Sequence, residues 1–145
     1  GEAVERLWRA ILAVTRADRP DPVAAWREHA AGLERRAAWL NDRRFAALHY
    51  RGPGTDLTLG LADGHDWKAA GVTARNGVPC IANLPTEEVF TMPHRGRAEG
   101  VVRATKPLSH QGTLIDGIRV RFAGGRIVEA RAARGEEALR SLLDT

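Results

Sequence analysis

Apolar residues change their spacing at Phe45, and this change limits the folds that are open to the chain. Before Phe45 they recur about every three to four residues, as on one face of a helix. After it, apolar and polar residues alternate, as on strands of which one face is buried. The sequence therefore predicts helices in the first third of the chain and strands in most of the remainder.

Two amphipathic helices are expected in this first third. One covers Glu2 to Ala17, and the other begins at Pro22 with Asp21 as its N-cap. Asn41-Asp42 closes the second helix. Large aromatic side chains on such helices usually lie in the core. We therefore expect three core anchors: Trp8, Trp26 and Trp39.

Short strands follow, separated by turns that contain glycine and proline. Phe45 to Tyr50 and Thr55 to Leu61 form a hairpin around Gly52-Pro53-Gly54. The other expected strands are Glu99 to Ala104, Thr113 to Ile115, Ile118 to Phe122 and Ile127 to Arg131, with short extended pieces at Cys80 to Asn83 and Glu87 to Thr91. A last helix is expected over Glu136 to Leu143.

This order predicts an α+β fold. Two N-terminal amphipathic helices would pack on a mainly antiparallel sheet, and a short C-terminal helix would follow the sheet. Residues 1–145 are long enough for a single domain or for part of one. The chain opens inside a helix and stops after the apolar pair Leu142-Leu143, so we expect a piece of a larger domain.

Composition and charge argue against several classes of protein. The net charge is +4, but the arginines are scattered and no aromatic strip accompanies them, so no nucleic-acid partner is expected. No apolar run approaches the roughly 20 residues that span a bilayer, so no membrane is expected. The N-terminus is typical of a helix rather than a signal peptide. The single Cys80 excludes an internal disulfide, is expected to be buried, and is compatible with the cytoplasm.

The segment Asn83 to Thr91 places two adjacent carboxylates, Glu87 and Glu88, in a short apolar run. Neighbouring side chains on a strand point to opposite faces, so one of the two is expected to point inward or into a cleft and the other to face solvent. Carboxylates are rarely buried unless they are paired, hydrogen-bonded or bound to a cation. The segment is therefore a candidate metal site, and a satisfied salt bridge or a surface pair is the alternative.

The histidines do not form a recognisable catalytic set. No two histidines have the i, i+4 spacing of a helical zinc-protease motif. The sequence also shows no recognisable Ser-His-Asp set. His65 and His94 flank the glutamate motif and are candidates to line a substrate path. The others are expected on a polar helix face, in a strand and in a loop: His29, His49 and His110.

Asn83 to Phe90 resembles the thermophilic metallo-aminopeptidases, the family of aminopeptidase T and aminopeptidase S. The resemblance runs along essentially the whole chain, in order and without large gaps. The other matching motifs are Asp21 to Trp26, Gly52 to Thr58, Gly60 to Ala62 with Gly64-His65 and Trp67, Glu99 to Ala104, Pro107-Leu108 and Gly117 to Gly125.

This resemblance implies a metal-dependent exopeptidase that removes N-terminal residues from peptides and forms a homodimer. The family uses two divalent metals of the zinc, cobalt or magnesium type, held by two Glu, two His and an Asp beside a catalytic Tyr. Only the first Glu falls within this chain. We place it on Glu88, with Glu87 as the close alternative, and no catalytic residue is expected because Tyr50 does not match.

The resemblance also implies that the rest of the enzyme supplies the missing ligands. A catalytic zinc takes about three protein ligands and a water, and one Glu cannot hold it. The isolated segment, the start of the catalytic region, is then expected to bind no metal stably and to be inactive. Two other readings stay open: a basic α+β binding or interaction module without catalytic activity, and a structural half-domain that dimerises.

Overall fold

A computed structural model describes residues 1–144, which form two compact units. The helical unit comprises Gly1–Arg44 and Asp66–Thr91, and the sheet unit comprises Phe45–His65 and the residues from Met92 onward. The elements are α1 (Glu2–Val14), α2 (Pro22–Arg43), β1 (Ala47–Gly52), β2 (Thr55–Leu61), β3 (Gly71–Thr73), β4 (Pro79–Ile81), β5 (Pro93–Arg103), β6 (Leu108–His110), β7 (Thr113–Ile115), β8 (Arg119–Ala123), β9 (Arg126–Arg131) and α3 (Glu136–Leu143).

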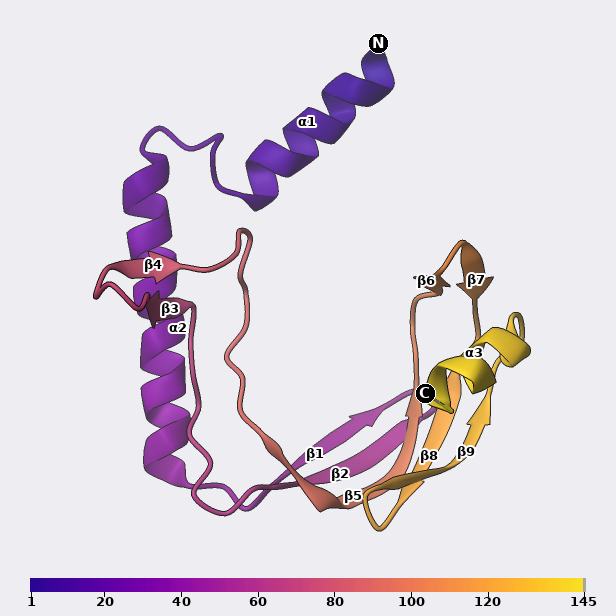
Figure 1. The fold of residues 1–145 in the computed structure, drawn as a ribbon. Coiled ribbons are helices and arrows are strands. Elements are labelled where there is room, and N and C mark those ends of the chain that lie inside the picture. The colour runs from indigo at the N-terminus through magenta and orange to yellow at the C-terminus, as the bar shows by residue number, and fades with distance from the viewer. Residues whose placement is uncertain (145) are drawn as a thin grey trace. The chain divides into compact units, whose positions relative to one another are not determined.

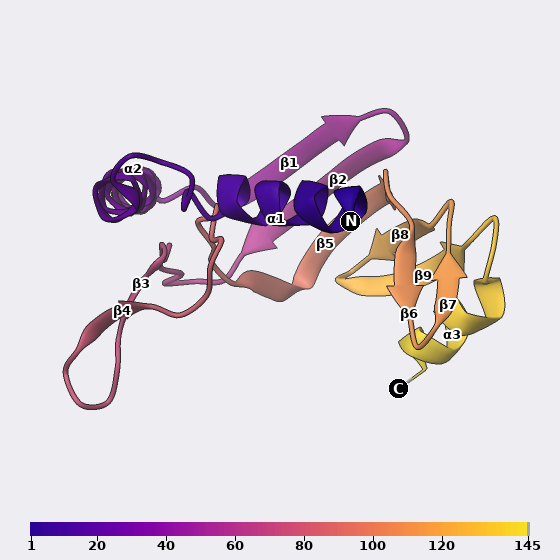
Figure 2. The same cartoon turned by 90° about the horizontal axis from the view of Figure 1, so that it is seen from above.

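The sheet unit is built on a five-stranded sheet in the order β1-β2-β5-β8-β9, with every neighbouring pair antiparallel (Figures 1 and 2). The short strands β6 and β7 form a separate hairpin, and α3 contacts β7 and β9. The buried apolar side chains of this unit are Leu57, Leu61, Ala98, Ile115 and Leu139.

Gly100 allows β5 to approach β2 closely. Its φ angle is +117°, a conformation that L side chains rarely adopt. A Cβ added there would lie 2.1 Å from the backbone oxygen of Asp56 on β2. Only a glycine fits this position of the ladder.

In the helical unit, α2 begins as the sequence predicts. The Asp21 side chain accepts a hydrogen bond from the backbone N–H of Ala24 at 2.9 Å, and Pro22 occupies the first turn. The buried side chains of α2 are Leu33 and Ala37. The same unit buries Trp67, Ala69 and Ala70, which precede the two-stranded β3–β4 sheet.

The first helix buries no side chain among the described residues. Trp8 is 58% exposed and Trp39 on α2 is 51% exposed, so the prediction that both are core anchors is wrong in this chain. Cys80 is also exposed rather than buried. Spacing alone shows which face of a helix is apolar, but not whether the chain itself covers that face.

The α+β class and the mainly antiparallel sheet are confirmed. The packing of the two N-terminal helices on the five-stranded sheet stays a prediction, as does the assignment of residues 1–145 to one domain or part of one. The first helix ends at Val14, earlier than expected, and Glu87 to Thr91 is irregular apart from a bridge at Phe90. Among the described residues, no helix is long and apolar enough to cross a membrane.

Candidate functional site

The glutamate motif is fixed in the helical unit by backbone hydrogen bonds at its end. Lys68 N–H donates to the Phe90 carbonyl at 2.8 Å, and Phe90 N–H donates to the Lys68 carbonyl at 3.0 Å. The Thr91 hydroxyl donates to the Asp66 carbonyl at 2.9 Å. These three bonds hold residues 86–91 against residues 66–68.

The partner segment is in turn attached to α2 by one side chain. The Asn41 amide donates to the Trp67 carbonyl at 3.0 Å and accepts from the Trp67 N–H at 2.7 Å. An amide side chain can do both because it carries a donor and an acceptor. The two backbone groups of the buried Trp67 are thereby satisfied.

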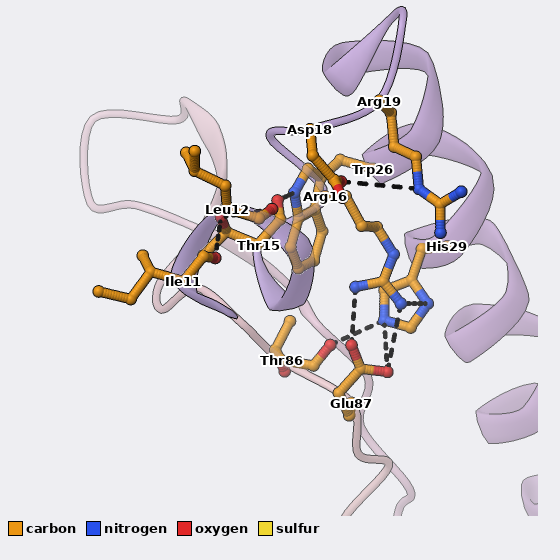
Figure 3. A network of polar contacts seen from close by, with 10 residues as sticks. All are labelled: Ile11, Leu12, Thr15, Arg16, Asp18, Arg19, Trp26, His29, Thr86 and Glu87. Carbon is orange, nitrogen blue, oxygen red and sulfur yellow. Dashed lines mark hydrogen bonds and ion pairs between the residues drawn. The ribbon is translucent and has the colours of Figure 1, made fainter. Parts of the chain in front are cut away.

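Glu87 is bound by a guanidinium from the connection between α1 and α2. Both terminal nitrogens of Arg16 contact the carboxylate, Nη1 to Oε1 at 2.7 Å and Nη2 to Oε2 at 3.3 Å (Figure 3). The Arg16 side chain is only 22% exposed, whereas that of Glu87 is 57% exposed. The guanidinium holds the pKa of the Glu87 carboxyl below its ordinary value.

His29 on α2 holds the residue before Glu87. Its Nε2 lies 2.8 Å from the carbonyl oxygen of Thr86, and its Nδ1 lies 3.1 Å from Nη2 of Arg16. A carbonyl can only accept and a guanidinium can only donate. Nε2 must therefore carry the proton and Nδ1 must be the acceptor, which assigns a neutral imidazole with its proton on Nε2.

The Trp26 ring contacts both side chains that hold the motif, Arg16 and His29. The Arg16 guanidinium lies over the indole at 4.9 Å from the ring centroid, and the His29 ring meets it edge-on at 5.4 Å. The indole Nε1–H donates to the Thr15 carbonyl at 2.5 Å. Figure 3 shows these side chains converging on Thr86 and Glu87 from the helical side.

A hollow of about 690 Å³ opens beside this cluster. Glu87 lines it together with Arg16 and His29, and Arg35 and Arg36 of α2 also contribute. Val89 lines a second hollow along α2, which Trp39 and Leu40 share. Glu88, which stands between Glu87 and Val89, lines neither hollow.

The two glutamates therefore have different surroundings. Neither side chain is buried, and the buried side chain of the motif is Thr86. Glu87 lines the first hollow and Glu88 lines neither, which agrees with the expectation that one of the two points into a cleft. The strand alternation behind that expectation does not apply here, because the segment is irregular. Glu87 has a cationic partner, whereas Glu88 makes no hydrogen bond or ion pair within residues 1–144.

His29 is the site residue that sequence reasoning missed, since it was expected on a polar helix face. Its side chain is 16% exposed, and its hydrogen-bond partners Arg16 and Thr86 lie 13 and 57 residues away, so no local pattern marks it. The other histidines have local partners. His49 contacts the Asp56 carboxylate at 2.7 Å, and His94 Nδ1 accepts from Gly96 N–H at 3.1 Å.

His65 and His110 also have partners nearby in the sequence. His65 Nδ1 lies 3.0 Å from the Ala62 carbonyl, within the turn that follows β2. His110 belongs to β6 rather than to a loop, and it pairs with Thr113 on β7. A role of His65 or His94 in a substrate path stays a prediction.

The described residues do not themselves complete a metal site. Within residues 1–144, no three His, Cys, Asp or Glu side chains come together in a group that could hold a metal ion. Within the motif, the Glu88 carboxylate has no cationic partner among residues 1–144, and it lies beside Glu87, which is paired with Arg16. This donor set fits one ligand of a larger site.

Comparison with known proteins identifies the family of this chain. The family model described as "Thermophilic metalloprotease (M29)" matches residues 1–145. Over 144 residues, the chain is 58% identical to aminopeptidase T of Thermus thermophilus and 56% identical to aminopeptidase T of Thermus aquaticus. It is 46% identical to aminopeptidase 2 of Geobacillus stearothermophilus over the same length.

Each of these three alignments covers 99% of this chain and 35% of the relative, so the chain spans about a third of their length. The solved structure of wild-type AmpT from Thermus thermophilus matches with a TM-score of 0.91 and 56% identity. That match covers 99% of this chain and 35% of the solved chain. This chain belongs to the M29 family of thermophilic metalloproteases.

Proposed function

We propose that this chain is a segment of a metal-dependent aminopeptidase that hydrolyses N-terminal residues from peptides. The relatives that match along its whole length are named aminopeptidases, and its family is one of metalloproteases. One observation supports the choice of a particular residue. Glu87 is held by Arg16, whereas the adjacent Glu88 has no cationic partner in residues 1–144.

We place the metal ligand on Glu88, with Glu87 as the alternative. The Glu87 carboxylate is engaged at both oxygens by Arg16, and metal binding there would have to displace the guanidinium. Glu88 has both oxygens available. Its exposed position suits a ligand that meets groups from outside this segment, because a carboxylate ligand needs several further donors around the same ion.

The whole enzyme would use two divalent metals, of the zinc, cobalt or magnesium type. Such ions lower the pKa of bound water and polarise the carbonyl of the bond to be cleaved. Glu88 would supply one carboxylate oxygen ligand, and the remainder of the enzyme would supply the others. Within residues 1–144, no group of three His, Cys, Asp or Glu side chains could hold a metal ion, which supports the proposal that this segment is inactive by itself.

The proposal includes the setting in which the enzyme works. Its substrate is a peptide, its immediate partner is the remainder of the same enzyme, and it forms a homodimer. A single cysteine is compatible with a cytoplasmic location.

A chimeric enzyme tests the proposal directly. In this chimera, the chain replaces the matching segment of Thermus thermophilus aminopeptidase T, to which it is 58% identical. We expect the chimera to bind metal and to cleave aminoacyl-chromogenic substrates. Glu88→Gln should reduce the metal content, and should lower kcat by about a hundredfold or more, because the amide is a much weaker ligand.

Two controls sharpen this test. Glu137→Gln changes an exposed acid on α3, far along the chain from the motif, and should leave metal content and kcat unchanged. The isolated chain should show no turnover with added zinc or cobalt. Full metal content in the Glu88→Gln chimera would contradict the assignment of the ligand to Glu88, and turnover by the isolated chain would contradict its proposed inactivity.

A further inference from the structure

We propose that Arg16 and His29 are positioning residues for the metal ligand. By binding Glu87 and the Thr86 carbonyl, they fix the backbone from which the Glu88 carboxylate extends. This inference rests on the proposed function and deepens it, because it assigns a role to two residues that lie outside the motif. Neither residue would touch the metal or the substrate.

The contacts engage two consecutive residues directly before Glu88. His29 Nε2–H donates to the Thr86 carbonyl at 2.8 Å, and Arg16 holds both oxygens of Glu87. On the other side of Glu88, Phe90 is paired with Lys68 through two backbone bonds. The Glu88 backbone is therefore fixed from both directions, although its own side chain makes no polar contact within residues 1–144.

The two positioning side chains also hold each other. Arg16 Nη2 donates to His29 Nδ1 at 3.1 Å, which leaves Nε2 as the only ring nitrogen able to donate to Thr86. Trp26 contacts both groups through its ring. Arg16 thus selects the tautomer of His29 that the Thr86 carbonyl requires, as partners outside the coordination shell often do for metal ligands.

An ordinary surface ion pair would not have these properties. Exposed pairs contribute little because solvent screens them and both side chains lose freedom. The Arg16 and His29 side chains are only 22% and 16% exposed, and they join parts of the chain separated by 71 and 57 residues. Their contacts determine where the motif lies relative to α2, within the helical unit.

The chimeric enzyme allows the two residues to be tested one at a time. Arg16→Met should weaken zinc binding by about tenfold or more, measured by competition with a chelator. The substitution should lower kcat more than it raises KM, because it displaces the metal-binding Glu88 carboxylate and not the bound peptide. Arg16→Lys keeps the charge but loses the bidentate fork, and should give an intermediate zinc affinity.

His29 supplies a pair of variants that separates positioning from packing. His29→Gln places an amide nitrogen near the position of Nε2, so it can still donate to Thr86, and zinc affinity should stay within about threefold of the parent. His29→Leu fills similar space without a donor and should lose about tenfold or more. If His29 only packed, glutamine would not restore zinc affinity better than leucine. Rescue by glutamine alone therefore indicates that the hydrogen bond to Thr86 matters.

Arg19→Met is the matched control. Arg19 lines the same hollow but contacts Asp18, at 3.8 Å, and not Glu87. Its removal should leave zinc affinity within about twofold. The melting temperature of each variant is measured beside the affinity, and if Arg16→Met fails to fold, Arg16→Lys and the two His29 variants decide the question.

The outcomes distinguish this inference from the proposed function. If the parent chimera binds no zinc, the proposed function fails and the inference fails with it. If Glu88→Gln binds zinc normally, the assignment of the ligand to Glu88 fails, and so does the inference, but the proposed function does not. If Glu88→Gln abolishes binding while folded Arg16 and His29 variants bind zinc within twofold of the parent, only the positioning role is overturned. Loss in Arg16→Met and His29→Leu, with retention in His29→Gln and Arg19→Met, supports it.

Discussion

The five-stranded sheet and the glutamate segment are held by different kinds of bond. In the sheet, each strand pairs with its neighbours through a ladder of backbone groups, with a register shift in the β2–β5 pair and another in the β8–β9 pair. In residues 66–91, backbone pairing is confined to the short β3–β4 sheet and the Lys68–Phe90 bridge. The contacts to the rest of the unit come from single side chains: Asn41 on Trp67, His29 on Thr86 and Arg16 on Glu87. A ladder distributes its stability over many bonds, whereas the segment depends on a few.

This difference bears on how each region can change. A ladder tolerates most side-chain substitutions but not an atom inserted between its strands. A segment held by a few side chains tolerates little substitution at those side chains. The other residues of the segment can be substituted more freely. The same dependence lets a small number of residues set the position of a functional carboxylate. The following substitutions, made in the chimeric enzyme, test this contrast.

The largest effect is expected from Gly100→Ala in β5. The added Cβ would lie 2.1 Å from the Asp56 oxygen on β2, at a φ of +117°. Separating the two strands should lower the free energy of unfolding by about 4 kcal/mol or more, the upper end for single substitutions. Gly96→Ala, in the same strand, meets only ordinary contacts and should change it by less than about 1 kcal/mol.

Denaturant unfolding followed by circular dichroism measures this pair. Equal midpoints for the two alanine variants would show that β5 can move away from β2 at little cost. The sheet would then not be more rigid than the glutamate segment.

Asn41→Ala is expected to have the next largest effect. It removes both hydrogen bonds to Trp67, whose backbone N–H and carbonyl are then left without these partners. The expected loss is roughly 2–4 kcal/mol in the same unfolding experiment. The control is Asn76→Ala, which removes a single exposed bond to Val78 N–H and should cost less than about 1 kcal/mol. Similar losses for the two variants would contradict a special anchoring role of Asn41.

Asp21→Ala tests the start of the helix that carries His29. Its side chain caps α2 through the Ala24 N–H, and loss of such a cap typically costs about 1 kcal/mol. Asp21→Ser should recover most of this loss, because serine also caps well. Hydrogen exchange of the first turn of α2 measures the local effect, and unchanged exchange in the alanine variant would refute it.

The smallest effect concerns Glu136 at the start of α3. Its carboxylate accepts from Arg140 and from the Ala132 N–H, and the hydrogen bond from Arg140 is the main cause of a lowered pKa. A lowered folded pKa means that the stabilisation is present above the ordinary pKa of the group. It is lost as the pH falls through the folded value.

The melting temperature of the parent should therefore exceed that of Glu136→Gln near neutral pH. The difference should shrink as the pH is lowered through about 4. A difference that stays constant down to about pH 3 would show that the carboxylate charge is not what stabilises the start of α3.

Much of the fold could be predicted because its signals are local. The alternation in Thr55–Leu61 and the Asp21-Pro22 cap each lie within a few residues, and both were confirmed by the structure. Two strands show where the local signals fail. Leu108–His110 is too short to show an alternating pattern, and β5 begins at Pro93 rather than Glu99, in a stretch rich in glycine and arginine.

The candidate site was predictable only in part. Two adjacent carboxylates in an apolar run drew attention to Glu87 and Glu88 without any structure. Their difference in environment could not be read from the sequence, because the partners of Glu87 and Thr86 lie 71 and 57 residues away. Contacts of that kind depend on tertiary packing and not on local spacing.

The open apolar stripe of α1 also determines how the isolated chain will behave in the laboratory. Six of its side chains are at least one-third exposed: Val4, Leu7, Trp8, Ile11, Leu12 and Val14. Such a surface favours self-association that increases with concentration, and hydrophobic association weakens on cooling. Preparations of the chain by itself should therefore turn cloudy on warming or concentrating and clear again when they are chilled or diluted.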